Sequence, residues 1–271
     1  MEISPLQKSS ATALFGDDWH QRWIGAGVSN WRAVEALLPR YRSRTAAAWL
    51  TLLRPELVED GYHVSDEALQ LYHSASFPET DVVDVDLHAR TLWRFHRGRW
   101  AEVGLECQAH LGGIEIARSL SVCRIADSDL GHDFGERNVP DVPVLTSPRD
   151  IGRIVIDDRQ TTDWATATHT EYPLHDDPCY AQRCGFPNTL VQAPLLVLEL
   201  LRFADLSAGG QVEAWFLEPV PVGALIAVKS ERVQEADVWS LHVANGLSAA
   251  VIAKTVPLGR SFSTHQTLQS A

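Results

Sequence analysis

The stretch "TLVQAPLLVLELLRFA", residues 189–204, is apolar on nearly every side when it is drawn as a helix. A helix on the surface of a globular protein keeps a polar face, whereas a helix that is hydrophobic all round must be covered on all sides. We therefore predict one buried helix over residues 190–204. The rest of the fold has to supply its cover.

Four strand-like segments follow this helix, between about residues 210 and 257. They read "GQVEAWFLEPV", "ALIAVKSERVQ", "ADVWSLHVAN" and "LSAAVIAKTVPL". The Asn245-Gly246 pair is a strong signal for a tight hairpin turn between the last two segments. An antiparallel sheet that curves round the buried helix would cover it. This order of elements predicts an α+β fold.

The first half of the chain is less regular. "SRTAAAWLTLLRPEL", residues 43–57, has Ala and Leu at helical spacing and predicts a helix that ends near Pro55. "SDEALQLYH", residues 65–73, begins with a Ser cap and acidic residues and predicts a short helix. The segments that follow predict an antiparallel meander with turns at "RGR" and "GG"; they are "ARTLWRFHRGRW", "AEVGLECQAHL" and "IEIARSLSVCRI".

A stretch rich in Asp, Gly and Pro, residues 127–153, separates the two halves and predicts a connector. "IGRIVIDDRQTTDWATAT", residues 151–168, then predicts a short strand and a helix capped by Thr or Asp. We expect an N-terminal half over residues 1–145 and a C-terminal half over residues 150–271.

Charge and composition exclude several classes of function. The 271-residue chain has 23 basic and 35 acidic residues, a net charge of −12, so general binding to nucleic acid or to an anionic membrane is not expected. The net charge does not exclude a local basic patch that binds a phosphate-bearing ligand. No apolar run approaches the roughly 20 residues of a membrane span, and "MEISPLQKSS" lacks the layout of a signal peptide. We expect a cytoplasmic protein with reduced thiols.

The cysteines form no metal-binding or disulfide pattern. Four cysteines in 271 residues do not make a disulfide scaffold, and Cys179 and Cys184 lack zinc-ribbon spacing. No G-x-G-x-x-G turn follows a strand-like segment. The sequence therefore predicts no metal and no tightly bound redox cofactor.

The segment "EYPLHDDPCYAQRCGFPNTLVQAPL", residues 171–195, is the most informative about function. It resembles the motif of the MaoC-like, R-specific enoyl-thioester hydratases and dehydratases, roughly D-x-N-P-x-H-x-D-x-x-Y-A followed by G-F/Y-P and H-G. The residues that match this motif are Pro173, His175, Asp177, Tyr180, Ala181, Gly185, Phe186 and Pro187. Pro194 and Leu195 match the P-L that opens the helix in the mitochondrial-type dehydratases and mesaconyl-CoA hydratase relatives. The resemblance covers about residues 151–258.

This resemblance implies a double hotdog fold, in which two antiparallel sheets each wrap a central helix, and it makes the first half a degenerate hotdog. The sequence departs from the motif at its catalytic positions. Thr170 stands where the family has its Asp, Tyr172 where it has Asn, and Gln192-Ala193 where it has H-G. Only the histidine of the family's catalytic pair is retained.

The catalytic candidates are His175, Glu171, Thr170 and Tyr172. His175, with an ordinary pKa of about 6.5, can take or give a proton near neutrality. Glu171 is the nearest carboxylate to the vacated position, although adjacent residues point in different directions. Thr170 is too weak an acid to be the base unaided, whereas Tyr172 could donate to a ligand oxygen or simply pack its ring. Asp177 is expected to cap the helix "PCYAQ".

The start of the buried helix is the predicted substrate-binding region. Unpaired backbone N–H groups there suit a carbonyl oxygen that becomes negative. Ala193 retains its N–H, Pro194 has none, and Gln192 could add its side-chain amide. Phe186 and Leu195 complete the predicted substrate-binding residues.

Three functions fit these residues. The first is a lyase that hydrates an enoyl thioester or dehydrates a 3-hydroxyacyl thioester carried by CoA or acyl carrier protein, possible as a homodimer. The second is a cyclase, isomerase or dehydratase of specialised metabolism that acts on a polyketide-like molecule in the same groove. The third is a non-catalytic subunit that holds an acyl ligand or stabilises a partner.

Overall fold

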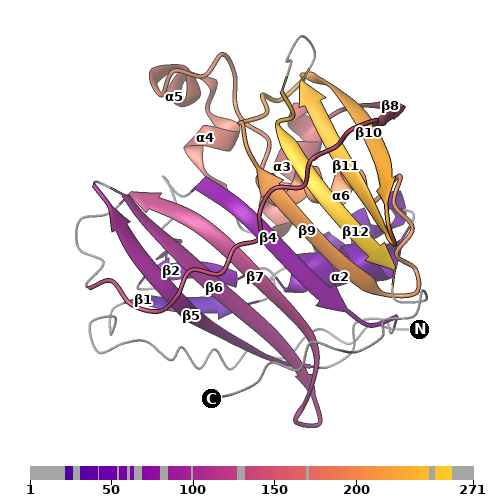
Figure 1. Ribbon diagram of the computed structural model, residues 1–271. Helices are drawn as coiled ribbons and strands as arrows, with labels where there is room; N and C mark the ends of the chain where they lie inside the picture. Colours follow the sequence, from indigo (N-terminus) through magenta and orange to yellow (C-terminus); the bar gives the residue numbers. More distant parts are fainter. Residues whose placement is uncertain are drawn as a thin grey trace.

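A computed structural model describes residues 22–26, 31–41, 43–53, 55–59, 62–63, 69–79, 85–98, 100–126, 132–168, 171–243 and 248–257. Most of the strands belong to one nine-stranded sheet (Figure 1). A separate three-stranded sheet contains β1 (Arg22–Ala26), β2 (Pro55–Glu59) and β3 (Tyr62–His63).

The nine-stranded sheet has the order β5-β6-β7-β4-β9-β12-β11-β10-β8, and all neighbours in it are antiparallel. Its strands are β4 (Leu69–Phe77), β5 (Asp86–Arg97), β6 (Trp100–Leu111), β7 (Ile114–Ala126), β8 (Arg149–Val155), β9 (Gly210–Phe216), β10 (Leu225–Val233), β11 (Ala236–Val243) and β12 (Val251–Pro257). The predicted meander of the first half and the four predicted strands of the second half are confirmed.

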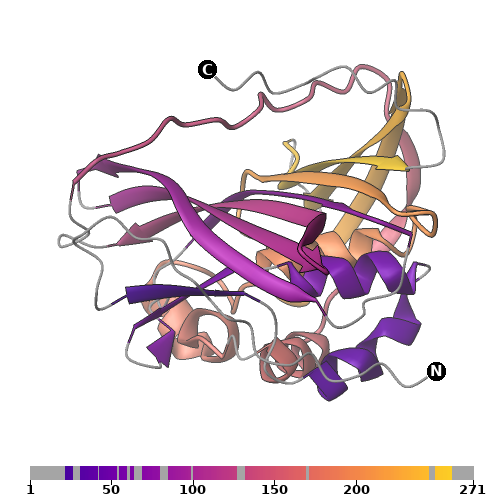
Figure 2. The same ribbon diagram turned by 90° about the horizontal axis from the view of Figure 1, so that it is seen from below.

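The helices lie on one face of this sheet, which we call the inner face (Figure 2). They are α1 (Trp31–Leu37), α2 (Arg44–Leu52), α3 (Asp158–Thr168), α4 (Pro173–Asp176), α5 (Pro178–Arg183) and α6 (Ala193–Leu200), with a 3-10 turn, η1 (Leu38–Arg40), after α1. Helices α2 and α6 contact each other under the sheet. The apolar core fills the space between these two helices and the inner face.

Helix α6 is the predicted buried helix, and it is shorter than expected. All its side chains from Leu195 to Leu200 are buried. Before it, Leu190 forms a β-bridge with Pro221, so the chain is extended there. After Leu200 the backbone tightens into turns with i→i−3 hydrogen bonds, such as Arg202 N–H to the Glu199 carbonyl at 3.2 Å. The helical residues are therefore 193–200 and not 190–204.

The two halves of the chain repeat the same order of main elements. In the first half α2 is followed by β2 and β3 of the small sheet and then by β4, and in the second half α6 is followed directly by β9. Strands β4 and β9 are each followed by a three-stranded meander whose last strand pairs with them. The sequence analysis expected two sheets. In the structure the main strands of both halves form one nine-stranded sheet, because β4 and β9 pair with each other, with Ser74 opposite Glu213.

The predicted helix over residues 65–73 is wrong where the structure describes it, because Leu69–Phe77 is strand β4. This strand lies in the middle of the sheet between β7 and β9. Tyr72 packs on the outer face, while Ala75 and Phe77 pack on the inner face. Pairing on both edges and burial on both faces override the cap signal of the preceding polar residues.

The predicted connector is not a free linker. Its end forms β8 from Arg149 onwards, and residues 132–148 cross the outer face of the sheet, opposite the helices (Figures 1 and 2). The indole N–H of Trp215 donates to the Pro140 carbonyl at 3.0 Å. Val139 and Leu145 pack against an outer apolar cluster that contains Trp93 and Trp215. The connector therefore acts as a cover for both halves.

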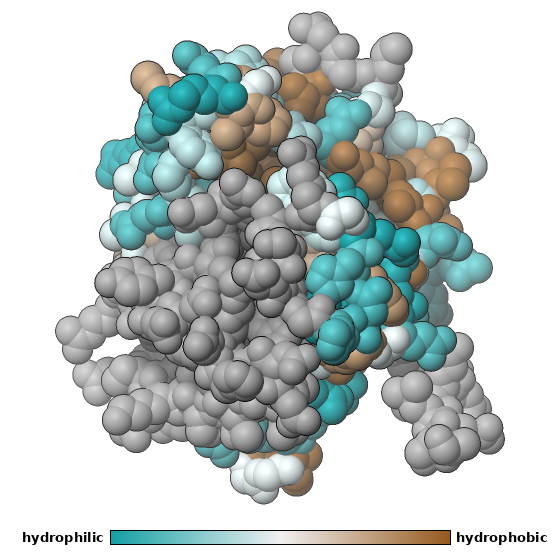
Figure 3. All heavy atoms as spheres, turned by 90° about the vertical axis from the view of Figure 1, so that its left-hand side faces the viewer, coloured by the Kyte–Doolittle hydropathy of each residue, from teal (hydrophilic) through white to brown (hydrophobic). Residues whose placement is uncertain are grey.

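On the face shown in Figure 3, the coloured atoms form hydrophobic patches among hydrophilic ones. The most exposed of the large apolar residues are Val144 of the connector, at 80%, and Ile114 at the start of β7, at 70%. In the part of the chain that the structure describes, no helix is long and apolar enough to cross a membrane.

Candidate active site

The short helix α4 carries His175 and is tied directly to the segment that leads into α6. The His175 ring nitrogen Nδ1 lies 2.8 Å from the Leu190 carbonyl oxygen. The Leu190 N–H donates to the Leu174 carbonyl at 3.0 Å. These two bonds join residues 15 or 16 positions apart and bring the motif histidine close to the N-terminus of the buried helix.

The contact with Leu190 fixes the tautomer of His175. A carbonyl oxygen can only accept, so Nδ1 must carry the proton and donate it. In the neutral ring the lone pair then lies on Nε2. Burial lowers the pKa of His175 below its ordinary value of 6.5, although the Leu190 carbonyl and the Asp176 carboxylate act in the opposite direction. Near neutral pH the side chain is therefore a neutral base with its lone pair on Nε2.

Within the described part of the chain, no residue hydrogen-bonds to Nε2 of His175. The Tyr172 ring lies beside His175, with its centroid 6.2 Å from the imidazole centroid and the planes at 49°. Tyr172 is also the residue that precedes α4 at its N-cap. The structure thus brings two of the four catalytic candidates, His175 and Tyr172, together.

Of the other two catalytic candidates, the structure describes only Glu171. Glu171 is exposed, and its carboxylate accepts a hydrogen bond from the Thr166 hydroxyl of α3 at 3.3 Å. Thr170 lies outside the described residues. No described carboxylate hydrogen-bonds to His175, which differs from the paired arrangement that the family motif implies.

The turn after α4 has the role that the sequence predicts. The Asp177 carboxylate caps α5 and accepts from the N–H groups of Cys179 and Tyr180 at 2.8 and 3.1 Å. At the other end of α5, Gly185 has φ +91°, a left-handed conformation that favours glycine. Phe186 follows, half-buried, with its N–H bonded to the Ala181 carbonyl at 3.0 Å. Asp177 and Phe186 therefore shape the loop around His175.

The N-terminus of α6 has one backbone N–H that no described group accepts. The N–H groups of Leu195 and Leu196 both bond to the Gln192 carbonyl, at 3.1 and 3.3 Å. Pro194 has no N–H, and no described group accepts a hydrogen bond from the Ala193 N–H. Ala193 is partly exposed, whereas Leu195 is buried in the apolar core. The Ala193 N–H is therefore the backbone donor available to a ligand here.

Gln192 lies at the N-cap of α6 but does not cap it with its side chain. Only 3% of the residue is exposed, and neither its Nε2 nor its Oε1 has a hydrogen-bond partner among the described residues. Thr189, on the same segment, has a buried hydroxyl that is equally unpaired in this part of the chain. Buried polar groups without partners are rare in native proteins, and Gln192 is the one described residue with two such atoms.

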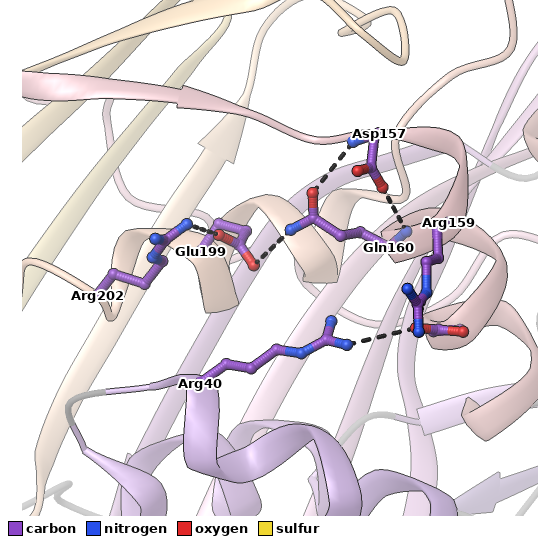
Figure 4. A pocket seen from close by; sticks show the side chains of 7 residues that line it. Arg40, Asp157, Arg159, Gln160, Glu199 and Arg202 are labelled. Atoms are coloured by element: carbon purple, nitrogen blue, oxygen red, sulfur yellow. Dashed lines mark hydrogen bonds and ion pairs between the residues drawn. The ribbon is translucent and has the colours of Figure 1, made fainter.

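A charged hollow of about 470 Å³ lies at the opposite end of α6 (Figure 4). It is lined by Arg40, Asp157, Arg159, Gln160, Asp163, Glu199 and Arg202. The sequence analysis did not identify this region. The signal was a single acidic residue, Glu199, in an otherwise apolar helix.

The groups that line this hollow are hydrogen-bonded or ion-paired to each other. Glu199, 1% exposed, is paired with Arg202 at 3.1 Å and accepts from the Gln160 amide at 3.5 Å. Arg40 pairs with Asp163 at 3.3 Å. Burial, and then the Glu199 carboxylate, raise the pKa of Tyr41. We infer that this network holds η1, α3 and α6 together.

No group of three or more His, Cys, Asp and Glu side chains among the described residues could hold a metal ion. Cys107 is buried, whereas Cys179 and Cys184 are exposed.

The chain shares its fold with known proteins. The chain has the hotdog fold of MaoC-like dehydratases, an antiparallel sheet with few helices. No family model and no curated protein matches the sequence.

Three solved structures illustrate this likeness. HtdX from Mycobacterium tuberculosis is 15% identical, with a TM-score of 0.62 over 87% of this chain and 99% of that one. The full-length peroxisomal multifunctional enzyme type 2 from Drosophila melanogaster is 14% identical, with a TM-score of 0.61 over 87% of this chain and 48% of that one. A MaoC-like dehydratase from Phytophthora capsici is 15% identical, with a TM-score of 0.56 over 73% and 74%.

Proposed function

We propose that this protein is a hydratase- or dehydratase-type lyase that acts on an acyl thioester carried by CoA or acyl carrier protein. The observation that carries the proposal is the state of His175. Its Nδ1 proton is held by the Leu190 carbonyl, and its Nε2 lone pair has no partner among the described residues. A neutral base therefore stands beside the N-terminus of α6, where the Ala193 N–H can receive a carbonyl oxygen.

We further propose that the fold is a double hotdog, with one hotdog in residues 1–145 and the other in residues 150–271. The repeated path supports this assignment: α2 with β4 to β7 corresponds to α6 with β9 to β12. The halves share one sheet through β4 and β9, and each contributes one helix to the inner face. All motif residues of the proposed site then lie in the second half.

His175 can serve both proton transfers of such a reaction. In the dehydration direction Nε2 takes a proton from C2 of a 3-hydroxyacyl thioester, while negative charge develops on the thioester oxygen. The Ala193 N–H stabilises that oxygen. The C3–O bond then breaks, and the proton on Nε2 passes to the departing hydroxyl, which leaves as water. Hydration is the reverse of these steps.

The departures from the motif favour an altered substrate. The family's Asp position is Thr170, and the neighbouring Glu171 carboxylate bonds to Thr166 instead of His175. A single histidine without a carboxylate partner also fits a second candidate, an isomerase or cyclase that only needs one acid/base group. A polyketide-like substrate is the ligand class we propose for that alternative.

The test is the turnover of 3-hydroxyacyl-CoA and enoyl-CoA pairs of increasing chain length, run in D₂O. Interconversion of the pair, abolished by His175→Asn, is the expected result. Deuterium exchange at C2 without loss of water would favour the isomerase or cyclase. Absence of both turnover and exchange with every thioester, in a protein that still binds them, would contradict the lyase and leave a non-catalytic acyl-binding subunit.

A further inference from the structure

The Gln192 side chain is a buried amide that has no hydrogen-bond partner among the described residues. It is 3% exposed, and both Nε2 and Oε1 lack a hydrogen bond within the described residues. A buried amide that has lost its water and gained nothing in exchange is unfavourable for folding. Each such group requires an explanation, and a role in binding or catalysis is one of them.

The position of Gln192 places its amide at the candidate site. It follows Leu190 by two residues, so their Cα atoms are at most about 7 Å apart. The Leu190 carbonyl is the group that holds His175. Gln192 also directly precedes Ala193, which is partly exposed and has the free N–H. A ligand between His175 and Ala193 would therefore lie within reach of the Gln192 side chain.

The chemistry of a primary amide restricts what this ligand can be. Nε2 only donates and Oε1 only accepts, and the two atoms are neighbours. A ligand satisfies both only if it carries an acceptor and a donor close together. An enoyl or a saturated acyl thioester offers the carbonyl oxygen alone, which leaves Oε1 unpaired. A 3-hydroxyacyl thioester offers the carbonyl oxygen to Nε2 and its hydroxyl proton to Oε1.

We propose that Gln192 is a specificity-determining residue that selects thioesters with a hydroxyl at C3 over those without one. This inference rests on the proposed lyase function and names the form of the substrate that the site binds most tightly. A site built to hydrogen-bond a hydroxyl rejects the analogue without it, because the buried protein groups are then left unpaired. In the free protein, the unpaired Gln192 amide already has this free-energy cost, and a 3-hydroxyacyl ligand would remove it.

The test is a set of binding titrations in the His175→Asn background, which prevents turnover. The probes are 3-hydroxybutyryl-CoA, crotonyl-CoA and butyryl-CoA. With Gln192 present, the hydroxyacyl probe should bind at least about tenfold more tightly than the other two. With Gln192→Met, which keeps the volume and removes both polar atoms, this preference should fall to about twofold or less. Thr189→Val is the matched control, since it removes a single hydroxyl that is also buried and unpaired among the described residues, and it should leave the preference unchanged.

Thermal stability provides a second and independent reading. Because Gln192→Met removes two unsatisfied buried atoms, it should raise Tm by roughly 2–4 °C. An amide with a structural role would give a lower Tm.

The outcomes separate this inference from the proposed function. Thioester binding with a preference that survives Gln192→Met would overturn the role of Gln192 and leave the lyase standing, as would loss of the preference in Thr189→Val alone. A lower Tm together with an unchanged preference would assign Gln192 to the fold. Failure of every thioester to bind would overturn both proposals.

Discussion

The two ends of α6 treat their polar groups in opposite ways. At the C-terminal end Glu199 is buried and hydrogen-bonded, and its partners come from α3 and from the turn after α6 (Figure 4). At the N-terminal end Gln192 is equally buried and has no partner among the described residues. The ends are only about 12 Å apart, the length of an eight-residue helix.

This difference distinguishes groups that hold the fold together from groups that await a ligand. A buried network in which every polar group is hydrogen-bonded stabilises the fold. Removing one member leaves its partners buried without a hydrogen bond, which lowers stability. An unsatisfied buried group costs folding free energy until a ligand binds. Substitutions at the C-terminal end should therefore lower stability with little effect on turnover, and those at the N-terminal end should change substrate binding or turnover without lowering stability.

The largest expected effect is at His175. His175→Asn keeps a side-chain N–H near the position of Nδ1, so the bond to Leu190 can persist, but it removes Nε2. Turnover should fall by at least about 10²-fold with little change in the free energy of unfolding. His175→Ala should lose the same activity and also roughly 1 kcal/mol of stability, because the bond to Leu190 is gone. Steady-state kinetics and urea unfolding measure the two quantities.

His242→Asn is the control for this pair, since His242 lies on β11 and bonds to Ser240. It should leave turnover unchanged. Full activity in His175→Asn would show that Nε2 takes no part in the reaction and would remove the contrast between the two ends of α6.

The next effect in size is at Glu199. Glu199→Gln preserves the shape but weakens the charge-assisted bonds to Arg202 and Gln160, so the free energy of unfolding should fall by about 1.5–3 kcal/mol. Turnover at a temperature where the variant is folded should stay within about twofold of the native value. Glu235→Gln, at an exposed position in the turn between β10 and β11, is the neutral comparison. A large fall in turnover with unchanged stability would place Glu199 in the active site.

A smaller effect follows from pH. Because burial lowers the pKa of His175 below 6.5, the imidazole stays neutral down to a lower pH than an exposed histidine would. The value of kcat/KM should be constant at pH values well above the pKa of His175. Below that pKa it should fall about tenfold per pH unit. A pH profile with an acidic limb centred above 6.5 would show that the general base is another group or that the ring is protonated at rest.

The smallest expected effect is at Thr170, which lies outside the described residues. The motif places a carboxylate at this position, so Thr170→Asp restores the family's acidic residue. We expect hydration of crotonyl-CoA to change by no more than about twofold, because Tyr172 and Gln192-Ala193 differ from the motif as well. A rise of about 10²-fold would indicate that only one catalytic group had been lost.

Much of the second half could be predicted from the sequence because its signals are local. The apolar run that becomes α6 and the four following strands are continuous segments with clear ends. The Asp177 cap and the Gly185 turn also depend on neighbours within a few residues. The hairpin predicted at Asn245-Gly246 lies outside the described residues, although β11 and β12 on either side of it do pair.

The parts that could not be predicted depend on contacts between distant residues. Strand β4 is a strand because β7 and β9 pair with it, and nothing within residues 65–73 reveals those partners. The connector docks on the sheet through Trp215, which lies 75 positions after Pro140. At the site, the register of the motif identified His175, but its tautomer depends on Leu190. The unpaired state of Gln192 depends on the whole environment of the amide.

The connector across the outer face has a practical consequence for engineering this protein. Long loops are usually chosen as insertion points for tags and fusion partners. Here an insertion near Pro140 would separate the connector from Trp215 and expose the outer apolar cluster. The turn between β6 and β7 is a better choice. Gly112 and Gly113 form its exposed tip with positive φ angles, and a side chain built on either would meet nothing within 4 Å. A reporter placed there leaves the sheet, its cover and the α6 termini untouched.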